Sequence, residues 1–242
     1  DSVKFALVQF PATVPARATG RVHLRVGRPP DPPAPCRLEV FSDRLEIDTG
    51  PARFTVRKGT TAGIDRAVID GQEILGGPTS ANFFIVEVGE KTGHLLGEIE
   101  EIDIEERGPL RVLVRVRGAM KPPPGSPDHF RFELALMAYA GQRALRAQYT
   151  FIALDHQDIY PVERLGLRLY FANTEPVAYR VDTSEGPREG VWDTGTFCAL
   201  HAFRGMDGSR FFVAGHKQPL ASGKDLPGRA SFRAAQSTVG VA

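Results

Sequence analysis

The sequence has no excess of charge of either sign. Its 242 residues include 30 basic and 29 acidic residues, so the formal net charge is +1. Proteins that bind nucleic acid or an anionic membrane through a broad field carry a clear basic excess. The chain also lacks an apolar run of the roughly 20 residues that a membrane-spanning helix needs. We therefore expect neither nucleic acid nor a membrane as a partner, and an acidic ligand would have to be recognised locally.

Cysteines and known catalytic motifs are also scarce. Cys36 and Cys198 are the only cysteines, and neither has the CxxC or Cys/His spacing of a zinc site. Two unpaired thiols are the favoured prediction, and a disulfide between them stays open. The sequence contains no GxSxG, P-loop, HExxH or EF-hand motif and no GxGxxG opening a helix. We expect no metal and no cofactor, and no motif assigns a catalytic residue.

What the sequence does contain is a strong alternation of apolar and polar residues with a period of two. In "RVLVRVRG" (111–118) the valines fall on one face of a strand and the arginines on the other. The same pattern fills 130–137, 145–151 and 164–171, whereas no segment keeps an apolar 3.6-residue repeat. With 25 glycines and 19 prolines, the chain is predicted to be all-β, an antiparallel β-sandwich of two large sheets.

Turn signals divide the alternating segments into individual strands. Residues 37–59 are predicted to form three short strands broken at Ser42-Asp43 and at 49–51. Asp70-Gly71, between two further strands, is a strong hairpin signal. The four segments from 110 to 171 are predicted to follow one another as an antiparallel meander.

A proline-rich stretch marks a boundary near the N-terminus. Residues 27–36, "GRPPDPPAPC", hold five prolines and cannot donate a continuous ladder of hydrogen bonds. We interpret 28–36 as a linker between a short β segment, 1–27, and a sandwich domain, 37–242. The segment 1–27 offers two strands at most, too few to be stable alone. The start on Asp1 suggests a processed chain or a piece of a longer one.

The row of arginines has two readings. It is either the solvated side of a sheet, with weak cross-strand Arg–Glu pairs, or a surface for an acidic glycan or a partner. The solvated side is the favoured reading. The residues expected to share this side are Arg111, Arg115, Arg117, Arg131, Arg146 and Arg168, with Glu105, Glu106 and Glu133.

Two further groups could carry chemistry. Residues 155–164, "DHQDIYPVER", combine acids, a base and a cation, as proton abstraction from a uronic acid requires, although loops between strands are polar by default. The C-terminal segment gathers cations and an aromatic side chain around the glycine-containing turn after Arg204, a set suited to an acidic sugar. The substrate-contact candidates are Trp192, His201, Arg204, His216 and Lys217.

Several phrases carry a resemblance to a known family. They are "FALVQFPATVPARATGRVHLRV" (5–26), "LEIDTGPARFTVRKG" (45–59), "DRAVIDGQEIL" (65–75), "IEERGPLRVLVRVRG" (104–118), "LALMAYAGQRALRAQYTF" (134–151) and "LGLRLYF" (165–171). Their order and spacing resemble the exo-rhamnogalacturonan lyase-like (YetA-like) proteins over residues 5–172. That family has an N-terminal barrel-like β domain, a central β-sandwich and a C-terminal α/α toroid. The resemblance implies that 1–27 are the closing strands of the barrel and 37–242 the central sandwich, with the toroid absent.

The resemblance also implies a function. We expect a non-catalytic β-sandwich portion of a polysaccharide lyase-like protein, secreted or periplasmic. It would meet the toroid of the full-length protein and an acidic polysaccharide containing rhamnose and uronate. The lyase reaction of the whole protein would be a β-elimination, and this chain alone would be inactive. The alternatives are a stand-alone carbohydrate-binding or adhesion module and a small complete enzyme using 155–164.

Overall fold

The structure is a computed structural model. It describes residues 10, 12, 14–23, 27, 34–58, 64–76, 83–88, 94–121, 130–154, 162–168, 172, 177–182, 186–192, 199–205, 208–214, 219–224, 230–234 and 237–241. In 83–96 it describes the backbone alone. From 162 onward it adds side chains only at 172, 178–180, 182, 186, 187 and 189–191.

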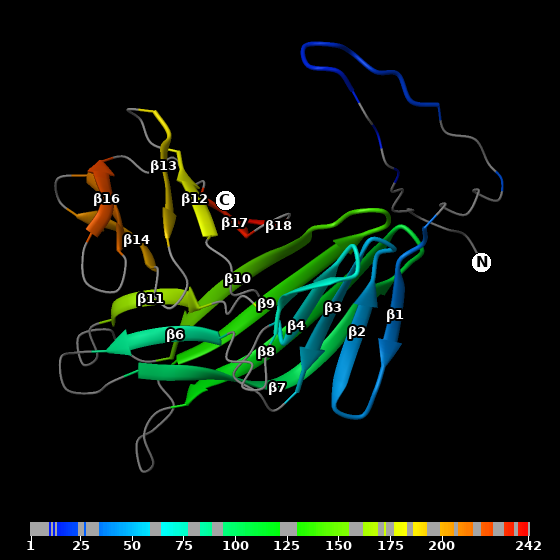
Figure 1. The fold of residues 1–242 in the computed structure, drawn as a ribbon. Coiled ribbons are helices and arrows are strands. Elements are labelled where there is room, and N and C mark those ends of the chain that lie inside the picture. The colour runs from blue at the N-terminus through cyan, green and yellow to red at the C-terminus, as the bar shows by residue number, and fades with distance from the viewer. Residues whose placement is uncertain are drawn as a thin grey trace. The chain divides into compact units, whose positions relative to one another are not determined.

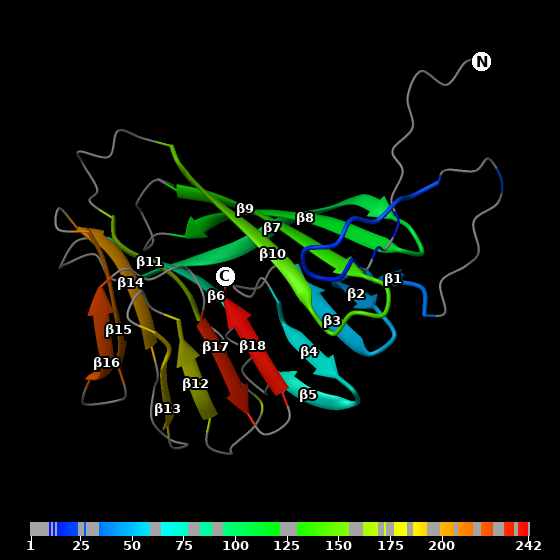
Figure 2. The same cartoon turned by 90° about the horizontal axis from the view of Figure 1, so that it is seen from above.

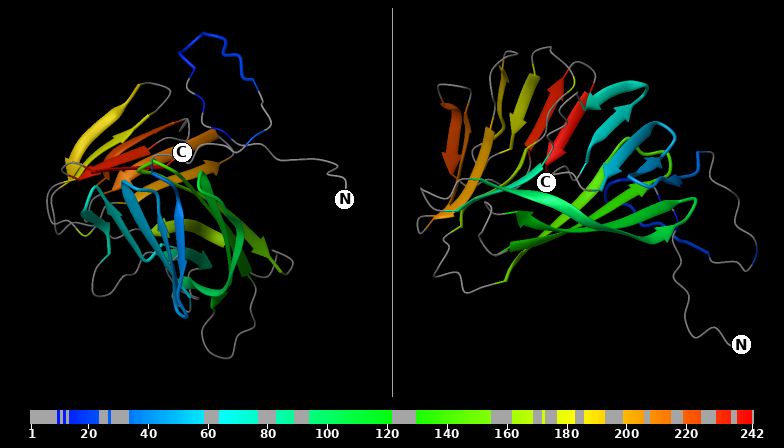
Figure 3. Two further views of the ribbon diagram at one scale, coloured as in Figure 1. Left: turned by 90° about the vertical axis from the view of Figure 1, so that its right-hand side faces the viewer. Right: turned by 90° about the horizontal axis from the view of Figure 1, so that it is seen from below.

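Two antiparallel sheets form the unit that spans Asp1–Tyr170. The first sheet has the order β1-β2-β3-β4-β5 and consists of β1 (Arg37–Val40), β2 (Arg44–Asp48), β3 (Ala52–Arg57), β4 (Arg66–Ile69) and β5 (Gln72–Leu75). The second has the order β10-β9-β8-β7-β6-β11 and consists of β6 (Phe83–Val88), β7 (His94–Arg107), β8 (Arg111–Lys121), β9 (Phe130–Tyr139), β10 (Leu145–Ala153) and β11 (Val162–Arg168). Figures 1 and 3 show the two sheets as separate layers. The predicted all-β sandwich is confirmed.

The core lies between these sheets, on the faces predicted from the alternation. On β8, Val112, Val114 and Val116 are buried. The valines are paired with residues of β9, and directly paired residues of neighbouring strands share a face. The buried residues on that face of β9 are Phe130, Phe132, Leu134 and Leu136. The first sheet contributes Leu38, Leu45, Ile47, Phe54 and Val56.

Hydrogen bonds between two turns at one end of the sandwich connect the two sheets. The hydroxyl of the buried Thr49, in the turn after β2, donates to the carbonyl of Gln142 in the turn after β9, at 2.6 Å. The amide of Gly141 donates in return to the carbonyl of Thr49, at 2.8 Å. Asp70 and Gly71 have φ of 49° and 80°, as the predicted two-residue hairpin between β4 and β5 requires. The three short strands predicted over 37–59 and their two breaks are also confirmed.

The predicted meander is wrong in its last step. β8, β9 and β10 do follow one another, but β11 pairs with β6 at the opposite edge of the sheet. Five strand spacings separate the two edges, about 24 Å at about 4.8 Å each. The eight residues 154–161 between β10 and β11 can extend over about 26 Å or more. A connection of that length can reach either edge, so local turn signals did not decide the partner of β11.

The predicted β segment over residues 1–27 is only partly described by the structure. The described residues of 1–27 contain no strand, only a turn around residues 16 and 17. Their assignment to the end of a barrel therefore stays a prediction.

Of the two cysteines, the structure describes one. Cys36 is free and buried, and burial raises the pKa of its thiol, while Cys198 lies outside the described residues. Within the described part, no helix is long and apolar enough to cross a membrane.

Phe171–Ala242 form a second unit of two small antiparallel sheets. One has the order β13-β12-β17-β18, which Figure 2 shows: β12 (Val177–Val181), β13 (Arg188–Trp192), β17 (Ala230–Ala234) and β18 (Ser237–Val241). The other has the order β14-β15-β16: β14 (Ala199–Gly205), β15 (Gly208–Ala214) and β16 (Pro219–Lys224).

Candidate functional site on the outer face of the six-stranded sheet

The charged outer face is the side of β7, β8, β9 and β10 that points away from the first sheet. Arg111, Arg115 and Arg117 lie on this face because their neighbours Val112, Val114 and Val116 are buried in the core. Register with β9 places Glu133 opposite Arg117 and Arg131 opposite Ala119. The face thus gathers most of the arginine row, except Arg168, which lies on β11 at the far edge.

Two β-bulges in β7 supply the acidic half of this face. The pairing of β7 with β8 skips one residue between Ile99 and Glu101 and another between Ile104 and Glu106. The skipped residues are Glu100 and Glu105. Each bulge therefore places two successive glutamates toward the outer cations, where a regular strand would place one.

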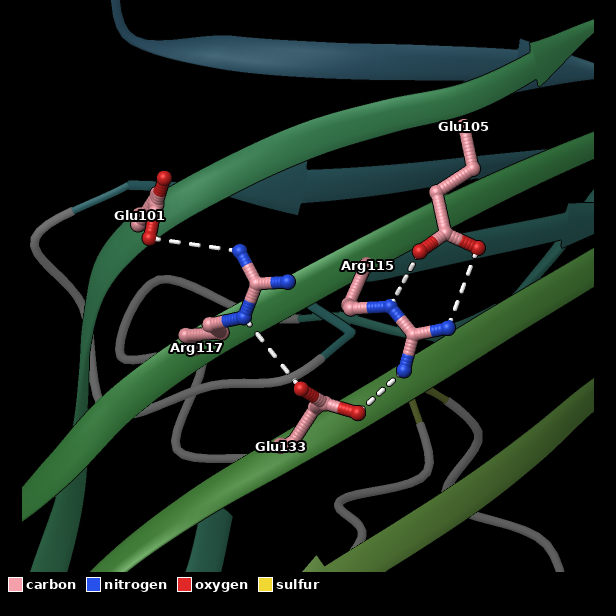
Figure 4. Close-up of polar contacts among 5 residues, drawn as sticks. All are labelled: Glu101, Glu105, Arg115, Arg117 and Glu133. Atoms are coloured by element: carbon pink, nitrogen blue, oxygen red, sulfur yellow. Dashed lines mark hydrogen bonds and ion pairs between the residues drawn. The ribbon is translucent and has the colours of Figure 1, made fainter.

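Arg115 and Arg117 share the carboxylate of Glu133, as Figure 4 shows. Arg117 Nε lies 3.2 Å from Glu133 Oε2, and Arg115 Nη1 contacts Glu133 Oε1. Arg115 also binds Glu105 through two nitrogens, with Nη2 at 3.0 Å from Oε2. Arg117 Nη1 reaches Glu101 Oε2 at 3.4 Å. Two cations and three carboxylates thus alternate across β7, β8 and β9.

The pattern continues toward both ends of β8. Arg111 Nε donates to Glu106 at 2.7 Å, and its Nη2 contacts the same carboxylate. Lys121 Nζ lies 2.9 Å from Glu100, and Arg131 lies 3.8 Å from the other oxygen of that carboxylate. Both bulged glutamates therefore serve cations of the outer face.

The ion pairs fix the protonation states of these groups. Hydrogen bonds from Arg115 lower the pKa of Glu105 below its ordinary value of 4.5, and hydrogen bonds to Glu105 and Glu133 raise the pKa of Arg115. The folded-state pKa of Glu105 is therefore below its unfolded-state value. The stability linked to this shift is present above the unfolded-state pKa near 4.5 and is lost as the pH falls through the lowered folded-state pKa.

This face is a charge-compensated surface. The side chains of Arg111, Arg115, Glu105 and Glu133 are 20–29% exposed, so water screens each pair and the pairs add little stability. A polyanion would have to displace carboxylates that already occupy the guanidinium groups. The geometry agrees with the solvated-side reading of the arginine row.

Removing the carboxylate charges that pair with Arg115 tests whether the charged outer face is compensated. The variant E105Q/E133Q should strengthen binding to immobilised polygalacturonate relative to the unchanged chain, because Arg115 would lose both charged partners. The gain should disappear in high salt, since exposed charges are screened. The matched control is E39Q/E73Q, with the same charge change on the other sheet. Equal retention of the two variants would contradict the prediction.

The chain matches a family model. The description of the matching model is "PcRGLX-like protein central beta sandwich domain", and it covers residues 37–212. The chain belongs to this family. The match begins at Arg37, where β1 begins, and ends at Phe212 inside β15. The predicted kinship with rhamnogalacturonan lyase-like proteins, through their central β-sandwich, is thereby confirmed. No curated protein matches the chain.

The family match does not assign roles to the predicted substrate-contact residues. His201 and Arg204 lie on β14, whose hairpin with β15 pairs them with Phe212 and Ser209. Trp192 ends β13, in the other small sheet. Nothing is described of these three side chains, and 215–218, with His216 and Lys217, lie outside the described residues. Convergence of the five residues therefore stays a prediction.

The second candidate group, 155–164, lies largely outside the described residues. Only its last three residues are described, as the start of β11, where the pairing with β6 skips Glu163. Across the described side chains, no cluster of three or more His, Cys, Asp or Glu could hold a metal ion.

Sequence reasoning missed the bulges in β7, although the sequence holds a signal for them. In "EIEEIDIEER" (98–107) the isoleucines stand at 99, 102 and 104, so the spacing of two is broken by the doublet at 100–101. A second doublet stands at 105–106. Acidic doublets that interrupt an apolar alternation are the observable sign of extra residues on the polar face.

Proposed function

We propose that the chain is a non-catalytic scaffold portion of a polysaccharide lyase-like protein that acts on acidic, rhamnose- and uronate-containing glycans. Membership in the central β-sandwich family supports the kinship. The observation that carries the scaffold role is the compensation of the outer arginines by Glu101, Glu105, Glu106 and Glu133. These cations are occupied within the sheet and are unsuited to neutralise a substrate carboxylate.

In the full-length protein, the chain would form one wall of a cleft whose other wall is the C-terminal α/α toroid. The reaction would be a β-elimination. A base removes the C5 proton of the uronate, the C4–O bond breaks as the C4–C5 double bond forms, and an acid protonates the leaving oxygen. A cation must neutralise the uronate carboxylate to make the C5 proton acidic. Trp192, His201, Arg204, His216 and Lys217 would contact the glycan, and such a substrate suggests a secreted or periplasmic protein.

Enzymatic assay of residues 1–242 tests the scaffold role. We expect no growth of the ultraviolet absorbance of an unsaturated uronate on rhamnogalacturonan or ulvan. Sustained turnover by this chain would overturn the proposal. A second measurement is calorimetric titration with oligosaccharides of the same polymers. Saturable binding that is lost in Trp192→Ala or Arg204→Ala, with no turnover, would favour the stand-alone binding module instead.

A further inference from the structure

The turn between β4 and β5 is connected to two other turns of the sandwich through Asp70. The amide of Asp70 donates to the carbonyl of Pro51, in the turn between β2 and β3, at 2.8 Å. The carboxylate of Asp70 accepts a hydrogen bond from Nε of Arg143, in the turn between β9 and β10, at 2.6 Å. Asp70 therefore belongs to a junction of turns that includes both sheets.

Asp70 is followed by Gly71, and an aspartate followed by glycine can react with its own backbone. The amide nitrogen of the glycine attacks Cγ of the aspartate and closes a five-membered succinimide ring. Glycine permits this attack because it has no Cβ to shield the nitrogen. A Cβ added at Gly71 would have nothing within 4 Å, and the side chain of Asp70 is 52% exposed. The space around Gly71 is therefore open, and solvent reaches the side chain of Asp70.

We propose that Asp70-Gly71 is a site of spontaneous isomerisation to isoaspartate and that Arg143 slows the reaction. The nitrogen of Gly71 bonds to Cγ of Asp70, while the amide proton and the hydroxyl of the protonated carboxyl group leave as water. Water from the solvent then adds to the main-chain carbonyl carbon of Asp70, and the bond from that carbon to the nitrogen of Gly71 breaks. The peptide bond has then moved to the side-chain carbon, with no net gain or loss of atoms.

Arg143 slows the ring closure by holding the carboxylate. Cγ of Asp70 must approach the nitrogen of Gly71, and a carboxylate that is hydrogen-bonded to Nε of Arg143 has to leave this partner before it can rotate. The pair is exposed, because 68% of the Arg143 side chain is accessible to solvent, and exposed ion pairs are weak. The restraint is therefore partial, so Asp70 reacts slowly in the unchanged chain and faster without the guanidinium.

Isomerisation would change the junction of turns. The two-residue turn places Ile69 opposite Gln72, and the length of such a turn fixes the register of its hairpin. Isoaspartate adds one methylene group to the main chain at residue 70 and moves the free carboxylate from Cβ to Cα. The hairpin pairing and the contact with Arg143 would both lose their present geometry. This inference concerns a covalent modification and is independent of the proposed glycan scaffold.

Peptide mapping by mass spectrometry after prolonged incubation in water labelled with heavy oxygen tests the proposal. At neutral pH we expect isoaspartate at residue 70 to carry labelled oxygen, because the water that opens the ring comes from the solvent. The variant R143Q should form isoaspartate about two- to fivefold faster, the factor that corresponds to the loss of an exposed ion pair. The matched control R146Q removes an arginine from an exposed position of β10 and should leave the rate unchanged.

The dipeptide Asp207-Gly208 provides a reference within the same molecule. Its rate of isomerisation should not respond to R143Q, whereas a general loosening of the fold would raise both rates. Circular dichroism verifies that both variants stay folded. Three results would overturn the proposal: no isoaspartate at residue 70 in R143Q, equal rates at residue 70 in R143Q and R146Q, or equal acceleration of Asp70 and Asp207 by R143Q. None of these depends on glycan turnover, so failure here is distinguishable from failure of the proposed function.

Discussion

Phe132→Ala is expected to lower the free energy of unfolding by about 3–5 kcal/mol, the range for removing a large buried aromatic ring. The side chain is 2% exposed in the centre of β9. Its ring covers Gly118 on the paired strand β8 and Gly97 on β7, the next strand beyond β8. A Cβ added at Gly97 would lie 3.0 Å from the ring, and one added at Gly118 would lie 2.6 Å from it. Glycines offer no side chain that could move into the vacated space, so the cavity would persist.

Urea unfolding followed by circular dichroism measures this loss. The control is Phe41→Ala, which removes the same side chain from an exposed site beside β1. Phe41 is 38% exposed and contacts the guanidinium of Arg44 at 4.1 Å, so its replacement should cost about 1 kcal/mol or less. Similar losses for the two variants would show that the ring of Phe132 is not an essential part of the core.

Gly118→Ala should destabilise the chain by about 3 kcal/mol, at the upper end of the usual cost of overpacking. A Cβ at residue 118 would overlap the carbonyl oxygen of Glu98 on β7 and would lie 2.6 Å from Cζ of Phe132. The first of these atoms is backbone in a paired strand, so relief requires moving β7 away from β8. That movement would disturb the bulged pairing beside it.

The same denaturation experiment, with Gly27→Ala as the control, checks this prediction. A Cβ at Gly27 would have nothing within 4 Å, so this change should be close to neutral. The double variant G118A/F132A separates the two overlaps. Because the overlap with the backbone of Glu98 remains without the ring, Phe132→Ala should not restore the stability lost in Gly118→Ala. Full restoration would mean that the ring alone makes residue 118 intolerant of a side chain.

The sandwich was predictable because the strands of its sheets show a local alternation of apolar and polar residues. Val112, Val114 and Val116 bury one face of β8 at every second residue, and no other regular structure has that period. The β4–β5 hairpin was predictable for a similar reason, since Asp70-Gly71 alone satisfies its backbone conformation. In both cases the deciding physics is contained within a few successive residues.

The features that escaped prediction depend on residues far apart in the sequence. The choice of β6 as the partner of β11 is decided by packing across the whole sheet, and the connection 154–161 is long enough for either edge. The pairing of Arg115 with Glu105 and Glu133 depends on register across three strands. Alternation placed these groups on one face but could not say which carboxylate meets which guanidinium.

The bulges in β7 also make the strand adjustable in length. Glu100 and Glu105 stand outside the residue-by-residue pairing with β8. Deleting either one would leave Ile99, Ile102 and Ile104 on the buried side, because the remaining residues would resume a regular alternation. Deleting Asp103 would instead move each residue that follows it in β7 to the opposite face of the sheet. Deletion of a single codon, for either Glu100 or Glu105, would thus shorten β7 by one residue without any rearrangement of the core.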